Sequence, residues 1–403
     1  TLNISNGGSV SSVNSLLGSG ASGNGTATVS GPGSSWSSSS QLTIGEGGGS
    51  TGTLNISSGG AVSSTGAILG SIANSDGTAT VDGSGSTWNN SGNLVVGNTG
   101  NGTLNISNGG NVSNTSGELQ LGAFGTGTMT INSGGTLSNT NGIIGASVNS
   151  SIFNMATVDG AGSTWTNSGE LRVGGSAFGE LTISNGGSVL NTTGFISGFS
   201  GIAGTATVGG TGSSWSNSDS LFIGGSDAVN IGTGDLTVNT GGLVDVGNLL
   251  KTSSAGTLIM EGGTVQATNV DVSEGTFTFN DGLVSVDSGV LTTTPSLVID
   301  SGTGSPLLRL NNGATSSLTG SLTVADTASG AMEILGGSAV SSNTGSVGTG
   351  TGSNGLVTVD GTGSTWSNTG GTLDIGDLGT GALTVSNGGS VNSSFTTLGD
   401  AGS

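Results

Sequence analysis

The stretch Gly102-Thr-Leu-Asn-Ile-Ser-Asn-Gly-Gly-Asn-Val-Ser113 decides the fold, because close copies of it recur along the chain. Within it, Leu104 and Ile106 alternate with polar residues, which is the period-two pattern of a strand with one buried face. The Asn-Gly-Gly run that follows signals a turn, since these residues adopt positive φ at little cost. Copies of this first phrase occur at Thr1–Val10, Thr53–Val62, Thr128–Leu137, Glu180–Val189 and Ala382–Val391.

A second phrase, Ala-Thr-Val-Asp-Gly-x-Gly-Ser-Thr-Trp, alternates with the first along much of the chain. One phrase follows another after about 25 residues, and periods of roughly 20–50 residues are typical of stacked-repeat architectures. Each interval holds three short apolar segments, separated by Gly and Asn corners. The sequence therefore predicts an all-β fold, a parallel β-helix (β-solenoid) with three short strands per rung of about 25 residues. The rung length and the irregular corners favour a right-handed helix.

Overlaying the two phrases predicts the core. Leu and Ile of the first phrase fall on Ala and Val of the second, and Val10 falls on Trp36. Each large Trp of the second phrase comes with a small Ala, such as Ala27 with Trp36, which indicates volume compensation inside one core. The predicted core residues are Trp36, Trp88, Trp165, Trp215 and Trp366, together with Leu2, Ile4, Leu54, Ile56, Leu104 and Ile106.

The repeat is regular at both ends of the chain and degenerate in the middle. Residues 1–226 and 355–403 carry the phrases clearly, and we expect the second segment to continue beyond the chain end. Between residues 227 and 354 the rungs shorten, because Leu236, Leu258 and Phe277 follow one another at smaller intervals than equivalent residues do elsewhere. We expect a continuous β-helix with shorter rungs in 227–354, with a separate domain there as the alternative.

Composition excludes several classes of function. The chain has 403 residues, a formal charge of −20 and only three cations, Arg172, Lys251 and Arg309. The clustered Lys and Arg that nucleic acids and anionic lipids require are therefore missing. There is no Cys for a disulfide or a thiolate metal site, and no apolar run long enough for membrane insertion. There is also no His and no Tyr, so catalysis would depend on a carboxylate pair. We expect a protein that is not an enzyme.

Two repeated residue types are candidate binding groups. The Trp series could form a ladder of sugar-stacking rings, but its pairing with Ala favours core packing. Asp82, Asp159 and Asp360 share one corner position and could form a calcium ladder. Ser30 and Gly209 interrupt that ladder, and calcium takes about six or more oxygen ligands. Solvated corner residues are the preferred interpretation, and no cofactor is expected apart from this open question of calcium.

A third repeated type, Asn, stands in the turn that follows the first strand of a rung. Its short amide side chain suits a turn and could stack along the helix axis as an amide ladder. The predicted corner turns are those of Asn6, Asn108, Asn185 and Asn387.

The two phrases resemble a known bacterial repeat. Thr-Val-Asp-Gly-x-Gly-Ser-Thr-Trp at Thr80–Trp88, Thr157–Trp165 and Thr358–Trp366, with Gly102–Gly110, is similar to the repeat shared by autotransporter passengers (type V secretion) and PEP-CTERM-associated surface proteins. The resemblance is close over Thr1–Gly224 and Gly355–Ser403, and the segment between them resembles passengers only as a general repeat. It implies secretion, a β-helical passenger and an exposed or adhesive role at the bacterial cell surface, and it brings no catalytic residues.

Sequence and resemblance together predict a non-enzymatic, extracellular structural or adhesive β-helical rod of a bacterial cell surface. The expected partners are the chain itself or host and surface glycans. Strand edges left open at the chain ends would allow copies to stack end to end into a filament. The alternative is a carbohydrate-binding or polysaccharide-cleaving β-helix that uses the Trp ladder or a carboxylate pair.

Overall fold

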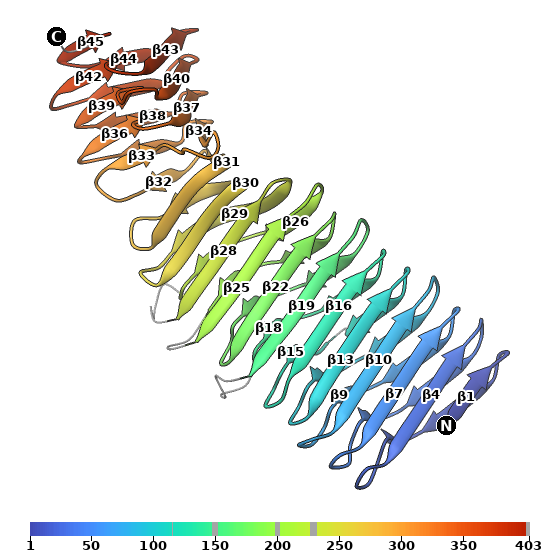
Figure 1. Ribbon diagram of the computed structural model, residues 1–403. Helices are drawn as coiled ribbons and strands as arrows, with labels where there is room; N and C mark the ends of the chain where they lie inside the picture. The colour runs from blue at the N-terminus through green and yellow to red at the C-terminus, as the bar shows by residue number, and fades with distance from the viewer. Residues whose placement is uncertain (115, 147–151, 198–201, 226–231, 400–403) are drawn as a thin grey trace. The chain divides into compact units, whose positions relative to one another are not determined.

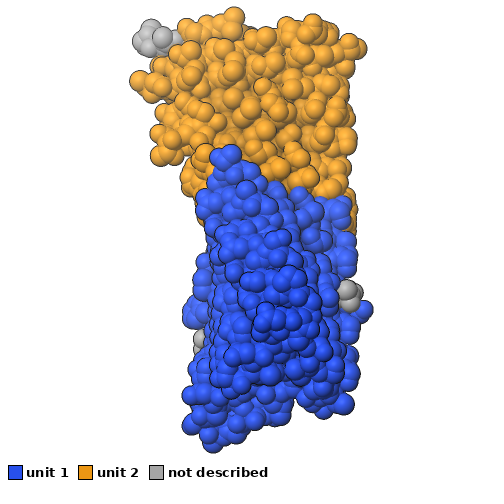
Figure 2. Space-filling view, turned by 90° about the vertical axis from the view of Figure 1, so that its right-hand side faces the viewer, with its two compact units in different colours: residues 1–218, 224–235 blue, residues 219–223, 236–403 orange. Residues whose placement is uncertain are grey.

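The computed structural model describes residues 1–114, 116–146, 152–197, 202–225 and 232–399. Every regular element among these residues is a β-strand. The chain forms two compact units, coloured separately in Figure 2: unit 1 comprises Thr1–Ser218 and Gly224–Asp235, and unit 2 comprises Asp219–Ile223 and Leu236–Ser403. The predicted boundary between residues 226 and 227 and the predicted continuation at Ser403 lie outside the described residues.

Unit 1 is a parallel β-solenoid in which each coil contributes a first, a second and a third strand (Figure 1). The first strands are β1 (Leu2–Ser5), β4 (Asn24–Ser30), β7 (Thr51–Ser57), β10 (Asp76–Asp82), β13 (Asn101–Ser107), β16 (Gly127–Asn132), β19 (Phe153–Asp159), β22 (Phe178–Ser184) and β25 (Ala203–Gly209). The second strands are β2 (Ser9–Ser12), β5 (Ser35–Ser38), β8 (Ala61–Ser64), β11 (Thr87–Asn90), β14 (Asn111–Asn114), β17 (Thr136–Asn139), β20 (Thr164–Asn167), β23 (Ser188–Asn191) and β26 (Ser213–Asn217). The third strands are β3 (Ser15–Leu17), β6 (Gln41–Ile44), β9 (Gly66–Leu69), β12 (Leu94–Val96), β15 (Leu119–Leu121), β18 (Gly142–Ile144), β21 (Leu171–Val173) and β24 (Gly194–Ile196).

Each strand of a coil pairs in parallel with the equivalent strand of the next coil. Leu104 of β13 pairs with Ala79 of β10 in the coil before and with Met129 of β16 in the coil after. The prediction of an all-β parallel β-helix with coils of about 25 residues, an interval typical of solenoids, is confirmed. Its right-handedness stays a prediction.

The register also brings together the residues that the overlay of the two phrases had matched. Val10 pairs with Trp36, and Trp88 stands between Val62 and Val112 of the coils on either side. All five Trp side chains lie in the interior, four of them with no exposed surface and Trp36 with 5%.

The aliphatic residues expected in the core include one exception. Ile4, Leu54, Ile56, Leu104 and Ile106 are at most 4% exposed. Leu2, by contrast, is only half-buried, because β1 pairs with β4 alone and nothing described covers its other side.

The Trp rings reach across the interior to the third strand of the preceding coil, a contact that the overlay with Ala did not reveal. A Cβ on Gly142 would lie 2.7 Å from Cζ2 of Trp165, and a Cβ on Gly345 would lie 2.6 Å from Cζ2 of Trp366. In each coil that precedes a Trp coil, the third strand carries a small residue at the position that faces the ring. Other coils carry Leu at this position, such as Leu94 or Leu119. The small residues are Ser15, Ala67, Gly142, Gly194 and Gly345.

Unit 2 begins with coils that contain fewer residues than the coils of unit 1. Val244 pairs with Val265, and Leu258 pairs with Phe277, so each of these coils takes fewer residues than a coil of unit 1. Long strands here run through the corner between two faces. The long strands are β29 (Gly242–Thr252), β30 (Gly256–Asp271) and β31 (Thr276–Asp287). They follow the short β27 (Leu221–Ile223) and β28 (Thr233–Asn239), which spans the boundary of the units.

The remaining coils of unit 2 return to three separate strands. Met332 pairs with Val357, which restores the coil length of unit 1. The third strands of these coils form a separate five-stranded sheet that begins at β33. The strands are β32 (Val290–Thr292), β33 (Leu297–Ile299), β34 (Leu307–Asn311), β35 (Thr315–Ser317), β36 (Ser321–Val324), β37 (Ser329–Leu335), β38 (Ala339–Ser342), β39 (Thr344–Val347), β40 (Asn354–Asp360), β41 (Thr365–Asn368), β42 (Thr372–Ile375), β43 (Thr380–Ser386), β44 (Ser390–Asn392) and β45 (Phe395–Leu398).

The contact of Trp165 with Gly142 predicts a strong coupling between the two positions. Gly142→Leu overpacks the core and should lower the free energy of unfolding by about 1–3 kcal/mol. Trp165→Val alone should cost about 3–5 kcal/mol, because it leaves a cavity. The double variant should be more stable than the sum of the two costs predicts, since the new Leu fills the space that the ring vacates.

Urea unfolding followed by circular dichroism measures this coupling. Gly66→Ala in β9 is the control, because a Cβ at Gly66 has no neighbour closer than 3.8 Å. Strictly additive effects of Gly142→Leu and Trp165→Val would contradict the packing described here.

Candidate functional site

The corner after the first strand is a tight turn in which Asn and Gly both have positive φ. At Asn108 and Gly109 the φ angles are 52° and 81°, and the N–H of Gly110 donates to the carbonyl of Ser107 at 2.8 Å. Two successive positive φ values define a type I′ turn, for which Asn-Gly is the preferred pair. The other predicted corner residues, Asn6, Asn185 and Asn387, have φ angles of 52°, 52° and 48°.

The corner Asp residues hold these turns from the preceding coil. Oδ1 of Asp82 accepts hydrogen bonds from the Ser107 hydroxyl at 2.6 Å and from the Asn108 amide at 2.7 Å. Asp159 is bonded in the same way by Ser184 and Asn185, and Asp360 by Ser386 and Asn387. We call each such group of one Asp, one Ser and one Asn an acid clamp.

The acid clamps of Asp82 and Asp159 favour the charged form of these two carboxylates. The hydroxyl of Ser107, and after it the amide of Asn108, lowers the pKa of Asp82 below its ordinary value of 3.8, against a smaller opposing effect of burial. Ser184 and Asn185 lower the pKa of Asp159 in the same way.

Within the ranges that the structure describes, the corner Asn and Asp side chains do not stack as continuous ladders, and calcium binding stays a prediction. The amides of Asn108, Asn185 and Asn387 donate to Asp and do not stack on one another. Asp82 stands between Ser57 and Ser107 in its column, so no second carboxylate adjoins it. Among the described residues, no three His, Cys, Asp or Glu side chains come together in a way that could hold a metal ion.

A ladder of Asn side chains does exist, but it lies inside the solenoid at the end of the second strand. Nδ2 of Asn90 donates to Oδ1 of Asn114 at 2.9 Å, and Nδ2 of Asn139 donates to Oδ1 of Asn167 at 2.6 Å. We call this series the interior polar column. Its residues, all at most 5% exposed, include Ser38, Ser64, Asn90, Asn114, Asn139, Asn167, Asn191, Asn217, Ser342 and Asn368.

The interior polar column receives the indole N–H of the Trp residues. Nε1 of Trp165 donates to Oδ1 of Asn139 at 2.7 Å, and Nε1 of Trp88 donates to Oγ of Ser64 at 3.1 Å. Trp215 and Trp366 bond to Asn191 and Ser342 in the same way, whereas Nε1 of Trp36 has no partner. The four hydrogen-bonded rings are thus fixed in the core and have no exposed surface on which a sugar could stack, and Trp36 is only 5% exposed.

The outer face of the first sheet in unit 1 presents columns of hydroxyl and amide groups. Thr78 pairs with Thr53 and Thr103, and Thr80 pairs with Asn55 and Asn105. Neighbouring strands lie about 4.8 Å apart, so the same small polar groups recur at that interval. We call this surface the hydroxyl array.

The hydroxyl array is interrupted at one place. Phe153 and Met155 of β19 are 63% and 41% exposed, and the ring of Phe153 lies 4.8 Å from that of Phe178 on β22. Contiguous exposed apolar groups on a polar surface often mark a contact site.

Shallow hollows lined by polar groups run along the end of the second strands in unit 1. One, of about 310 Å³, is lined only by Ser, Thr and Asn of three consecutive coils, between Ser37 and Ser91. Another, of about 240 Å³, is lined by Asn114, Ser138, Asn139, Thr166 and Ser168. We call these two hollows the hydroxyl trough; neither is lined by a charged side chain.

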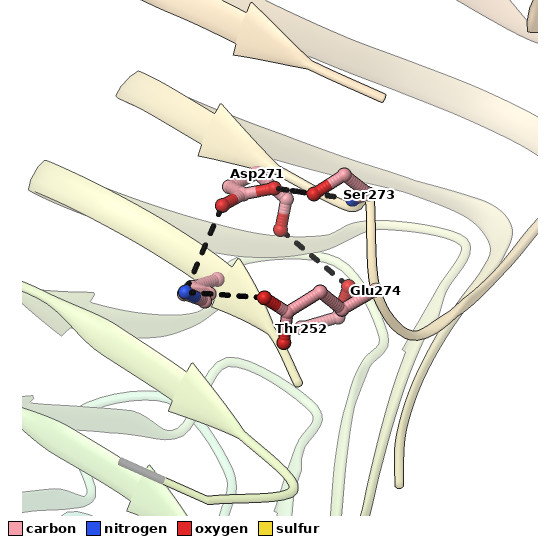
Figure 3. A network of polar contacts seen from close by, with 5 residues as sticks. Thr252, Asp271, Ser273 and Glu274 are labelled. Atoms are coloured by element: carbon pink, nitrogen blue, oxygen red, sulfur yellow. Dashed lines mark hydrogen bonds and ion pairs between the residues drawn. The ribbon is translucent and has the colours of Figure 1, made fainter. Parts of the chain in front are cut away.

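The one Lys of the chain, Lys251, lies in an ion cluster of unit 2, which sequence reasoning missed. Figure 3 labels Asp271, Ser273 and Glu274 of this cluster. Nζ of Lys251 is 3.9 Å from a carboxylate oxygen of Asp271 and 3.9 Å from one of Glu274. Asp271 also accepts the hydroxyl of Ser273 at 2.6 Å. The shortened coils bring these residues together, and they fall in the segment where the phrases are hard to recognise. Arg172 and Arg309 likewise pair with Glu170 and Glu333.

Two carboxylates share a small hollow near the end of unit 2. Asp374 and Asp377, with Ile375 and Thr397, line a space of about 150 Å³. Polysaccharide cleavage would require a pair of carboxylates, and none of the residues that line this hollow is a cation.

Comparisons with known proteins add little to this geometry. No family model matches the chain, and no curated protein matches it. Among solved structures it is similar to the crystal structure of a TibC-catalyzed hyper-glycosylated TibA55-350 fragment, with 18% identity, a TM-score of 0.44, and coverage of 96% of this chain and 100% of that one. A likeness at this identity and score leaves the function to be argued from the chain itself. In the described residues we find no helix of a length and apolarity that would cross a membrane.

The lowered pKa of Asp82 predicts a pH-dependent contribution to stability. The pKa in the folded chain lies below the ordinary value, so the contribution is complete above the ordinary carboxyl range and disappears as the pH falls through the folded pKa. Asp82→Ala should therefore lower the free energy of unfolding at pH 7 by about 1 kcal/mol or less, because the clamp is partly solvated. The difference from the wild type should shrink between about pH 5 and about pH 2.

Urea midpoints of the wild type, Asp82→Ala, Ser107→Ala and the double variant test this over the pH range. Ser107→Ala removes the donor and keeps the carboxylate, so the double variant should cost less than the sum of the single variants. A difference that stays constant down to pH 2 would show that the clamp does not act through the charge of Asp82.

Proposed function

We propose that the chain is a non-enzymatic structural and adhesive β-helical scaffold, exposed outside the cell on a bacterial surface. The observation that carries this proposal is the hydroxyl array, in which the same small polar groups recur coil after coil in one register. A repetitive surface binds by many weak contacts at once, and linked weak contacts give a strong overall attachment. The phrase resemblance to autotransporter passengers and PEP-CTERM-associated proteins supports the same location.

The composition and the ion pairs support exposure to a harsh exterior. The chain has no Cys to oxidise, and its three cations all pair with carboxylates in the described part of the chain. Association of copies with one another remains part of the proposal, and electron microscopy of the native material distinguishes filaments from single particles.

Binding of neutral glycans is the second candidate function, favoured by the hydroxyl trough. Its Ser, Thr and Asn groups can exchange hydrogen bonds with sugar hydroxyls, and the absence of charge from its lining suits an uncharged chain. Polysaccharide cleavage has weaker support, since it would depend on the hollow between Asp374 and Asp377.

Adhesion can be measured with beads that carry the chain at graded surface densities. Beads with the native chain should be retained under flow by a surface of neutral polysaccharide or of bacterial cells, and retention should rise steeply with density because the contacts are multivalent. Beads with the urea-denatured chain are the control. Retention equal to that of the control, or shortening of the polysaccharide during the assay, would overturn the proposal.

Resistance to trypsin is a further expected property of such a scaffold. Arg172, Lys251 and Arg309 lie in β21, β29 and β34, each of which pairs with a strand on both sides. Cleavage there requires local unfolding, so the native chain should stay intact under conditions that cut the urea-unfolded chain at all three sites.

Ser84→Arg is the matched control for this experiment, because it places a cleavage site in the exposed turn after β10. Gel electrophoresis should show cutting at residue 84 well before cutting at Arg172. Equal rates at the two sites would mean that the strands open as easily as the corners.

A further inference from the structure

On the face of the solenoid that carries Thr276–Phe279, two successive coils of unit 2 do not pair with each other. We call this gap in the strand pairing the step. Thr276–Phe279 precede the segment Leu283–Asp287, which pairs with β34, and they follow Val270, which pairs with Leu291 of β32. β33 lies between β32 and β34 in the chain (Figure 1). It therefore occupies the same place in its coil that Thr276–Phe279 occupy in the coil before.

These two segments do not pair with each other. Thr276–Phe279 pair with Thr257–Met260 of the preceding coil, and β33 pairs with β36 of the following coil. In the described part of the chain, β33 starts a separate sheet. Two strand edges thus face the step: Thr276–Phe279 of β31 on one side and β33 on the other.

A cavity of about 450 Å³ lies at this step, within the range of about 300–1,000 Å³ that is typical of ligand sites. Both edges contribute to its wall, through Thr276 and Phe277 on one side and Leu297 and Val298 on the other. On the inner side, Phe277 is half-buried whereas its partner Leu258 is fully buried. Val298 alternates with the buried Leu297 and Ile299, so it faces outward, and it is 55% exposed.

The peptide groups of Val298 point into the step. The carbonyls of Pro295 and Ile299 accept hydrogen bonds from Gly320 and Ala325 of the next coil. In a strand, the N–H and C=O of one residue point to the side opposite those of the next residue. The carbonyl of Ile299 points toward β36, so the N–H and C=O of Val298 point away from it. An open strand edge of this kind is a template for another strand.

We propose that this step is a binding site for an extended peptide segment of a partner polypeptide, which inserts as a β-strand and pairs with the edge of β33. Main-chain hydrogen bonds would supply affinity, and apolar side chains at alternate positions would contact Phe277 and Leu297. The site is independent of the hydroxyl array and of the proposed adhesion.

Charge defines the partner further. Lys251 pairs with two carboxylates, Asp271 and Glu274, so this ion cluster keeps an excess of negative charge. Asp281 adds a further carboxylate close to the step in sequence, and Arg309 is paired with Glu333. A neutral or basic peptide is therefore favoured over an acidic one. A second copy of this chain, with a formal charge of −20, would approach against electrostatic repulsion.

The test uses the full chain and a fluorescein-labelled peptide, Lys-Val-Thr-Val-Thr-Val-Lys, with binding followed by fluorescence anisotropy. Val298→Pro removes the N–H that faces the step, and Pro is tolerated on an edge strand whose N–H side is free. Val298→Ala is the matched control, because it shortens the side chain and keeps the N–H. We expect Val298→Pro to bind the peptide at least tenfold more weakly than Val298→Ala, with unchanged urea midpoints.

Two altered peptides keep the test decisive if Val298→Pro fails to fold. A peptide methylated on alternate backbone nitrogens should lose binding to the wild type, and a version with Glu in place of Lys should bind more weakly. Equal binding of the methylated peptide, equal binding by Val298→Pro and Val298→Ala, or no binding at millimolar peptide would overturn the proposal. Self-association that Val298→Pro abolishes would also overturn it, since a second copy would then be the occupant.

Discussion

Parallel pairing between equivalent strands of successive coils is the constraint on which the rest of the structure depends. Because Leu104 is aligned with Ala79 and Met129, and Trp88 with Val62 and Val112, each side chain meets the same position of the neighbouring coil. A shift of the register by one residue would turn the apolar positions to the outside. The repeated sequence keeps this alignment over the coils of unit 1, since successive interfaces between those coils are chemically similar.

Column-wise alignment explains how large and polar groups are accommodated inside a narrow core. The ring of Trp165 occupies space that Gly142 leaves free in the coil before, and its N–H reaches Asn139 of that same coil. A buried polar group is tolerated when its hydrogen bonds are made, and the interior polar column makes them between coils. The fit therefore depends on pairs of coils, and substitutions in this core should be felt one coil away.

The two sites that we propose for partners arise in different ways. Where the repeat is regular, the outer surface offers many copies of the same weak contact, as in the hydroxyl array. Where the repeat fails, in unit 2, the coils shorten, Lys251 meets two carboxylates, and a step opens between Phe277 and β33. The first kind of site suits multivalent adhesion, and the second suits recognition of one particular peptide segment.

The sequence by itself determined the fold class, because the alternation of Leu104 and Ile106 with polar residues and the interval of about 25 residues admit few other arrangements. It also matched Val10 with Trp36 and predicted the turn at Asn108. Only the tertiary structure decided which groups meet across coils. The Asn ladder lies inside at Asn90 and Asn114, while the corner Asn residues bond to Asp. The sequence likewise did not predict the unpaired edge of β33. Such contacts join side chains of different coils. The register of the strands sets the distance between these side chains, and the pattern within a single phrase does not specify that register.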